Sequence, residues 1–141
     1  MRRWIAAAIS ILVLAGANAW AADAPKVTVK PVLSTTTTAS GQPVTVPANP
    51  QVIVSTYDIP VGAVLPFHKH PFQRYAYVMA GDLSVVNRDT SETYRYKTGD
   101  FIVEVLDQWH MGRNEGKTPV KLLVIDQVEP GKPNVVMAPT P

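Results

Sequence analysis

Residues 50–128 consist of short runs of β-branched and aromatic residues that alternate with turn residues, a pattern typical of consecutive β-strands. The runs span residues 51–57, 75–79, 83–87, 92–97, 101–105 and 120–128. From residue 23 onward, no window keeps the i, i+3, i+4 apolar spacing that an amphipathic helix requires. Strands that recur with a turn about every 8–12 residues predict an all-β domain, either a sandwich or a small barrel.

The clearest turn signal in this region is the tripeptide Ala80-Gly81-Asp82, which separates the runs 75–79 and 83–87. Glycine and aspartate are typical of the tight turns that join two antiparallel strands. We therefore expect these two runs to pair with each other as a β-hairpin.

The composition excludes several classes of function. Hydrophobic residues make up 46% of the 141 residues, enough for one core, and the formal net charge is +2. Arg2 and Arg3 account for this excess, and without them eleven basic residues face eleven acidic ones, so we expect no nucleic-acid partner. The chain has no cysteine, which excludes disulfides, thiolate metal ligands and cysteine nucleophiles. It also lacks a glycine-rich phosphate loop and a G-x-S-x-G nucleophile motif.

Residues 1–22 have the three parts of a secretory signal peptide. Two arginines are followed by an apolar run over residues 4–17, and small residues then allow cleavage after Ala19, Ala21 or Ala22. We expect a periplasmic or secreted protein with no stable membrane association after cleavage. The alternative is an uncleaved anchor, although the apolar run is short for a span of about 20 residues.

Two proline-rich segments flank the strand-rich region. Residues 23–49 form a Pro/Thr-rich segment in which short edge strands are expected, because proline confines strands to sheet edges. Residues 50–128 are expected to form the all-β domain, and the Pro-rich C-terminal tail, residues 129–141, is expected to lie on the surface or to fray. The sequence thus predicts a single domain with two peripheral extensions.

The chain has three histidines, and two of them are separated by a single residue in His68-Lys69-His70. Side chains alternate between the faces of a strand, so both imidazoles point the same way and Lys69 points the other way. This arrangement offers two nitrogen ligands to a metal ion, and imidazole suits zinc, iron, copper and nickel. The alternative for the pair alone is a solvated strand face.

The residues around the histidines form two motifs. The first reads Gly62-x5-His68-x-His70-x3-Arg74-x6-Gly81, and the second reads Gly99-x5-Val105-x-Asp107-x2-His110-x3-Asn114. Together they resemble the two motifs of the cupin superfamily in their histidine and asparagine spacings and in three flanking glycines. The resemblance covers roughly residues 50–128 and includes every histidine of the chain.

The resemblance implies a double-stranded β-helix, the cupin jelly-roll barrel. It also implies that His68, His70 and His110 face the interior and bind one divalent transition metal; iron, manganese, nickel, copper and zinc are not distinguishable on this basis. The alternative is a metal-free cupin whose ligand pocket has been emptied.

The sequence departs from the family at the position four residues after the second histidine. The family places a glutamate ligand there, whereas this chain has Arg74, which stays protonated and cannot bind a metal. Three interpretations remain open. Arg74 binds a substrate carboxylate or another anion, it forms an ion pair with Glu104 or Asp107, or it turns outward and leaves Gln73 near the site.

The second motif departs from the family as well. It has Val105-Leu106-Asp107 where cupins have Pro-x-Gly, which predicts a differently set loop before His110.

Two classes of function fit these residues. The first is a metal-dependent oxidoreductase of the dioxygenase type, acting on a small molecule at three histidines with open coordination positions. The second is a non-catalytic binding module for a small anionic ligand, with Arg74 and Gln73 in the pocket. The apolar run 51–57 could also add to the sheet of a neighbour, so a homodimer is expected.

Overall fold

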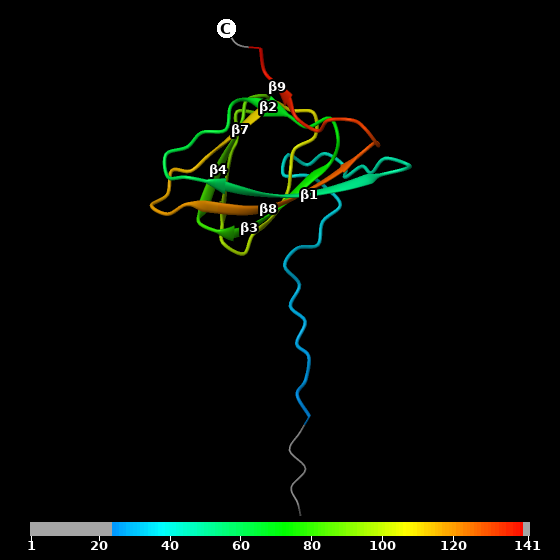
Figure 1. Ribbon diagram of the computed structural model, residues 1–141, viewed down its shortest axis with the longest axis vertical. Helices are drawn as coiled ribbons and strands as arrows, with labels where there is room; N and C mark the ends of the chain where they lie inside the picture. The colour runs from blue at the N-terminus through cyan, green and yellow to red at the C-terminus, as the bar shows by residue number, and fades with distance from the viewer. Residues whose placement is uncertain (1–23, 140–141) are drawn as a thin grey trace, which may run out of the picture.

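A computed structural model describes residues 24–139, and within these residues all regular secondary structure is β (Figure 1). The expected signal peptide, residues 1–22, lies outside this range. The strands are β1 (Gln51–Ile59), β2 (His68–Lys69), β3 (Arg74–Ala80), β4 (Asp82–Asn87), β5 (Thr93–Lys97), β6 (Phe101–Val103), β7 (His110–Arg113), β8 (Val120–Val128) and β9 (Val136–Met137). No helix in the described part of the chain is long and apolar enough to span a membrane.

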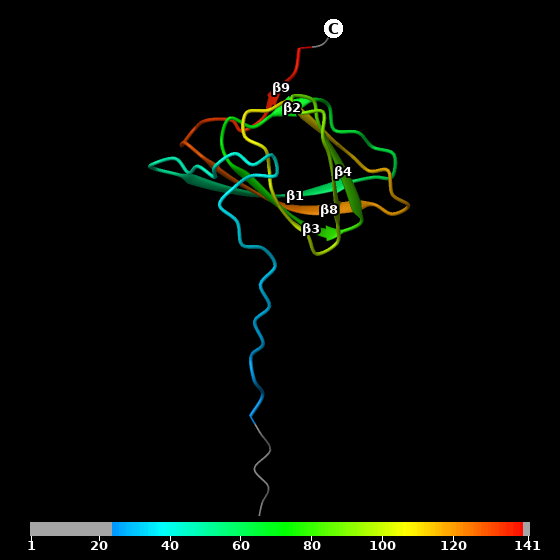
Figure 2. The ribbon, with the colours of Figure 1, turned by 180° about the vertical axis from the view of Figure 1, so that it is seen from behind.

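The strands form two antiparallel sheets that face each other around one interior (Figures 1 and 2). One sheet has the order β1-β8-β3-β6 and the other has the order β5-β4-β7-β2-β9. This is the jelly-roll arrangement of a double-stranded β-helix, which confirms the predicted fold.

The longest ladder joins β1 to β8, and β8 supplies much of the core. The register runs from Gln51 opposite Val128 to Ile59 opposite Val120. Alternate residues of β8 are buried, as a strand with one face on the core requires. The main core cluster consists of Ile59, Ala76, Val78, Leu83, Ile102, Val120, Leu122 and Val124. Each fully buried Val, Leu or Ile side chain in this cluster stabilises the fold by about 1.5–3 kcal/mol, before entropy costs.

The predicted hairpin between the runs 75–79 and 83–87 is wrong. Both runs are strands, but β3 pairs with β8 and β6 while β4 pairs with β5 and β7, so they lie in different sheets. The turn between them carries the chain from one sheet to the other. Gly81 has φ +80°, and a Cβ there would lie 2.6 Å from the Pro119 carbonyl oxygen, so only glycine fits this corner.

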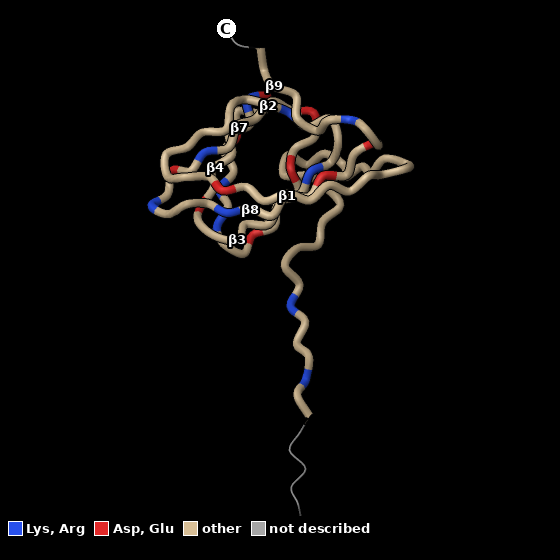
Figure 3. Tube along the Cα trace, in the orientation of Figure 1, with Lys and Arg blue, Asp and Glu red and all other residues tan. Residues whose placement is uncertain are grey.

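The segment before β1 lies outside both sheets. Its first part extends away from the barrel (Figure 1), and Val27 and Val29 in it are 92% and 84% exposed. Closer to the barrel, Thr37 and Pro43 form an isolated bridge. Figure 3 shows basic and acidic residues interspersed along the trace of the barrel.

The C-terminal tail is more ordered than its composition predicts. It lies at the surface, but Val136 pairs with Lys69 and Met137 pairs with His68 across β9 and β2. The backbone N–H of Ala138 also donates a hydrogen bond to the carbonyl of Phe67. The tail therefore packs directly against the strand that carries the first histidine.

Candidate metal centre

The structure brings the three histidines together at one end of the interior. His68 and His110 are paired residues of β2 and β7, and His70 follows just after β2 ends. Their ring centroids are 4.5–4.9 Å apart, and one ligand nitrogen from each ring lies within 4.8 Å of the others. His70 and His110 are buried, while His68 is half-buried. Lys69 forms an ion pair with Asp107 instead.

Backbone carbonyls fix the orientation of all three rings. The Nδ1 atom of His68 lies 2.7 Å from the carbonyl oxygen of Pro66, that of His70 lies 2.5 Å from the carbonyl of Asn134, and that of His110 lies 2.8 Å from the carbonyl of Gln108. A carbonyl only accepts hydrogen bonds, so each Nδ1 carries a proton and donates it. In a neutral imidazole with this proton on Nδ1, the lone pair is on Nε2, which is the arrangement that metal-binding histidines adopt.

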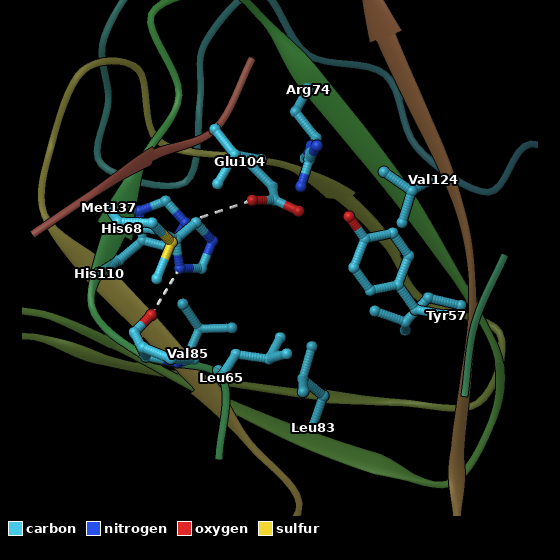
Figure 4. A pocket seen from close by; sticks show the side chains of 14 residues that line it. Tyr57, Leu65, His68, Arg74, Leu83, Val85, Glu104, His110, Val124 and Met137 are labelled. Carbon is cyan, nitrogen blue, oxygen red and sulfur yellow. Dashed lines mark hydrogen bonds and ion pairs between the residues drawn. The ribbon is translucent and has the colours of Figure 1, made fainter. Parts of the chain in front are cut away.

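A carboxylate completes the cluster. The Oε2 atom of Glu104 lies 3.1 Å from Nε2 of His70 and 3.4 Å from Nε2 of His110. Figure 4 shows Glu104 beside His68 and His110. Nitrogen and oxygen ligands about 2.0–2.2 Å from one metal ion lie roughly 2.9–3.5 Å from each other. The spacing of Glu104 from the two histidines is therefore that of ligands sharing one ion.

The residues present fit a divalent cation. Nε2 of His70 and Nε2 of His110 are buried and make no hydrogen bond. A neutral imidazole with its proton on Nδ1 directs the Nε2 lone pair at the charged oxygen of Glu104, and that contact alone is repulsive. A cation among these atoms turns the repulsion into attraction, and three imidazoles with one carboxylate suit iron, manganese, nickel, copper and zinc. This set would hold the metal without using Arg74.

Glu104 takes the place of the missing family glutamate from a neighbouring strand. Tyr75 of β3 pairs with Val103 of β6, and the N–H of Glu104 donates to the carbonyl of Arg74, so these two residues are cross-strand neighbours. Cross-strand neighbours share a face of the sheet, and both side chains reach the same cavity. The carboxylate is therefore supplied by the residue that follows β6, and not by β3 as in the family motif. The sequence analysis missed Glu104 as a ligand because the signal depends on the β3–β6 register.

Arg74 points inward and forms its ion pair with Asp126. Neither of the two expected partners, Glu104 and Asp107, forms an ion pair with it. Its Nε donates to Oδ1 of Asp126 at 2.7 Å and its Nη2 donates to Oδ2 at 2.9 Å, and both side chains are buried. The expected ion pair with Glu104 or Asp107 is therefore corrected to Asp126, which lies opposite Arg74 on β8. The interpretation that Arg74 turns outward is also wrong, because only 6% of this residue is exposed.

The electrostatics of the cluster keep two of the candidate ligands, His68 and Glu104, in the form that binds a metal. Burial lowers the pKa of His68 to about 4, so this imidazole is neutral at pH 7. Burial on its own would raise the pKa of Glu104, but His110, His70 and the charge of Arg74 hold it well below its usual range. Burial also acts to lower the pKa of Arg74, but the hydrogen bonds that Arg74 donates to Asp126 and the negative charges of Glu104 and Asp126 outweigh it and raise that pKa.

Comparison with known proteins places this fold and site in a family. The family model for the cupin domain (Cupin_2) matches residues 55–126, about half of the chain and the part that carries all three histidines. The chain is a cupin. No curated protein sequence matches it.

Solved structures show the same barrel in proteins with different activities. The cupin resembles the polyketide cyclase RemF from Streptomyces resistomycificus at 19% identity and a TM-score of 0.56, over 67% of this chain and 64% of the cyclase. A cupin with a double-stranded β-helix fold from Methanocaldococcus jannaschii is 17% identical, with a TM-score of 0.50, over 54% of this chain and 69% of that one. An oxalate oxidase in complex with glycolate is 25% identical, with a TM-score of 0.51, over 61% of this chain and 45% of the oxidase. The fold therefore does not determine the reaction.

Gln73 lies beside the site but faces the backbone. Its side-chain nitrogen donates to the carbonyls of Arg74 and Glu104, which ties the start of β3 to the end of β6. It is buried and is not among the residues that line the cavity. A direct role in ligand binding stays a prediction, while its hydrogen bonds position the two charged residues.

The second motif of this cupin keeps its turn without glycine. Asp107 adopts φ +50°, the left-handed conformation that the family's glycine would take. Its N–H donates to the carbonyl of His70, and its side chain pairs with Lys69. The loop before His110 is therefore fastened to the segment that carries the other two histidines. Asn114 closes a turn through Ile59, Gly116 and Thr118 and does not contact the site.

A cavity of about 140 Å³ extends from the cluster into the barrel. His68, His110, Glu104, Arg74 and Tyr57 supply its polar groups (Figure 4). The rest of its wall is formed by Leu65, Pro66, Leu83, Val85, Gly112, Leu122, Val124, Val135 and Met137. The candidate centre thus adjoins a space that a small molecule can enter.

Proposed function

We propose that this cupin is a metal-dependent enzyme that acts on a small molecule in the adjoining cavity. Its one divalent transition metal is bound by His68, His70, His110 and Glu104. The observation that carries the proposal is the convergence of the ring nitrogens. Three Nδ1 atoms are committed to carbonyls, and two buried Nε2 atoms without hydrogen bonds face one carboxylate oxygen.

The residues around the ligands favour the ionised form of the Glu104 carboxylate. Asp126 anchors Arg74, and the charge of Arg74 favours the ionised form of Glu104. Asn134 donates to Asp126 and accepts from His70 through its carbonyl, so one network connects the ion pair to a ligand ring. Such outer contacts typically change metal affinity by about 10–100-fold when they are removed.

Dioxygenase-type oxidation is the reaction class we propose. A redox-active divalent ion held by histidines and a carboxylate supplies Lewis acidity and a route for electrons between dioxygen and substrate. The cavity adjoining the ligands provides room for a substrate at the same centre. The oxalate oxidase that the chain resembles is an oxidase built on this barrel.

The alternative is a non-catalytic module that binds a small anion through Arg74. The contacts of Arg74 weaken this alternative, since two of its three guanidinium nitrogens already donate to Asp126. The resulting pair carries no net charge with which to attract an anion.

We also propose that the chain is exported through cleavage of residues 1–22, and that it forms a homodimer through β1. That strand is at the edge of its sheet, and Val52, Ile53 and Val54 on it are 56%, 39% and 58% exposed. An edge strand with apolar side chains is suited to pairing with a second copy. Light scattering of the mature protein tests this, and a monomer at micromolar concentration contradicts it.

The test of the enzymatic proposal is oxygen consumption by the iron-loaded protein. Catechol, acetylacetone and cysteine serve as chelating phenol, carbonyl and thiol probes, and His110→Ala serves as the control that lacks a ligand. We expect uptake with at least one probe and none above background for the variant. A protein that retains iron but consumes no oxygen with any probe supports the binding-module alternative.

A further inference from the structure

The cavity beside the candidate centre has an apolar floor. Leu83, Leu122 and Val124 line it and are 5%, 4% and 2% exposed, so they lie at its closed end. Val135 and Met137 are 40% and 53% exposed and mark the side that opens to solvent, next to β9. A ligand that enters past the C-terminal tail therefore meets hydrocarbon on most sides.

The polar groups of the cavity gather on one side. Figure 4 shows the hydroxyl of Tyr57 pointing toward Arg74 and Glu104, across from Leu65 and Leu83. The ring of Tyr57 also lies against the guanidinium of Arg74, 5.8 Å from its Cζ atom. The cavity is consequently divided between a polar side next to the histidines and an apolar side.

The charges at the polar side suit a ligand with a single negative oxygen. The charges of Arg74 and Asp126 cancel each other, and a carboxylate at Glu104 would offset one of the two charges of a bound divalent ion. One positive charge would then remain, which one phenolate or enolate oxygen would neutralise. A dicarboxylate would bring a second negative charge close to Glu104 without a free cation to pair with it.

The volume sets the size of the apolar part. An apolar cavity of about 150 Å³ accepts a benzene ring. The cavity here is about 140 Å³, so its volume matches that of one six-membered ring.

We propose that the substrate of this site is a monocyclic phenol or enol. Its ring lies against Leu65, Leu83 and Val85, and its oxygen faces the histidines and Glu104. The proposal rests on the function proposed above as far as the metal is concerned, while the fit of the ring depends only on the cavity.

The test uses fluorine NMR on the zinc-loaded protein, since zinc binds without oxidising the probe. The probes are 4-fluorophenol and difluoroacetate, which carry one ionisable oxygen group each but differ in the apolar ring. We expect 4-fluorophenol to bind at least tenfold more tightly than difluoroacetate. Equal affinity, or tighter binding of difluoroacetate, overturns the proposal in favour of a small anion.

A pair of neighbouring substitutions locates the ring. Val85 lines the cavity, whereas Val86 is the next residue of β4 and faces the other side of the sheet. Val85→Phe should weaken 4-fluorophenol at least tenfold, and Val86→Phe should change it less than twofold. Equal effects of the two variants overturn the proposed position. If Val85→Phe fails to fold, transfer of magnetisation from the ring protons to the methyls of Leu65 and Leu83 in the unaltered protein replaces it, and its absence refutes the proposal.

Repeating the titration without metal separates this proposal from the proposed function. A protein that refuses zinc but shows transfer to these methyls refutes the metal proposal and supports the ring site. A protein that binds zinc but not 4-fluorophenol refutes the ring site and leaves the metal proposal standing.

Discussion

Removing the carboxylate of Asp126 should destabilise the protein more than any exposed ion pair does. Asp126 accepts two hydrogen bonds from Arg74, at 2.7 and 2.9 Å, and both side chains are less than a tenth exposed. Asp126→Ala leaves a buried guanidinium without its partner, because the pKa of Arg74 prevents it from becoming neutral. Breaking a buried pair from one side costs about 3–5 kcal/mol.

Urea denaturation of the metal-free protein measures this loss. With an m-value of about 1.5 kcal/mol/M, the midpoint should fall by roughly 2–3 M. The matched control is Asp58→Ala, which breaks an exposed pair with Lys121 at 3.6 Å and should cost less than about 1 kcal/mol.

A double variant separates the unpaired charge from other consequences of the substitution. Arg74→Met combined with Asp126→Leu removes both charges and should recover at least half of the lost stability, since a buried pair is often replaceable by apolar residues. If Asp126→Ala costs no more than Asp58→Ala, the account of Arg74 as a residue dependent on Asp126 is wrong.

Three further predictions follow from the site and from the corner at Gly81. Glu104→Gln should weaken zinc binding at least tenfold in a competition titration with a chromophoric chelator. The control Glu92→Gln, at an exposed position, should leave zinc affinity unchanged. Equal zinc affinities of the two variants would remove Glu104 from the ligand set. Gly81→Ala should lower the urea midpoint because its Cβ meets the Pro119 carbonyl at 2.6 Å, and an unchanged midpoint would contradict the corner geometry. The metal-free protein should lose stability as the pH falls from about 6.5 to about 4, because His68 takes up a proton near pH 6.5 in the unfolded chain but only near pH 4 in the folded one. The urea midpoint should therefore depend less on pH in His68→Gln than in the unaltered protein. An identical pH dependence of the two midpoints would contradict the lowered pKa.

The strands were largely predictable from the sequence because their signal is local. The run 120–128 coincides with β8, and 51–57 falls within β1, since β-branched residues and alternating burial mark a strand wherever it pairs. The histidine motifs were equally local. Their spacings carried the resemblance to cupins, which implied His68, His70 and His110 as ligands, and the structure brings these residues together.

The features that the sequence analysis missed depend on which strands are neighbours. The turn at Gly81 is typical of a hairpin, but β3 and β4 lie in different sheets and pair with other strands. Glu104 becomes a candidate ligand only once β6 is placed beside β3, where it lies opposite Arg74. Asp126 is 52 residues from Arg74 in sequence, and no local pattern connects them. Pairing across a sheet is a tertiary property, and a single sequence does not carry its register.

The central claim is that three histidines and Glu104 bind one divalent metal ion. Elemental analysis of the mature, untagged protein purified from its native host tests it most directly, with His110→Ala prepared in parallel. We predict close to one iron, manganese, nickel, copper or zinc ion per chain, and loss of that ion in a variant that still folds. A protein that contains no metal and refuses added metal, or a His110→Ala variant that retains a full equivalent, would contradict the account.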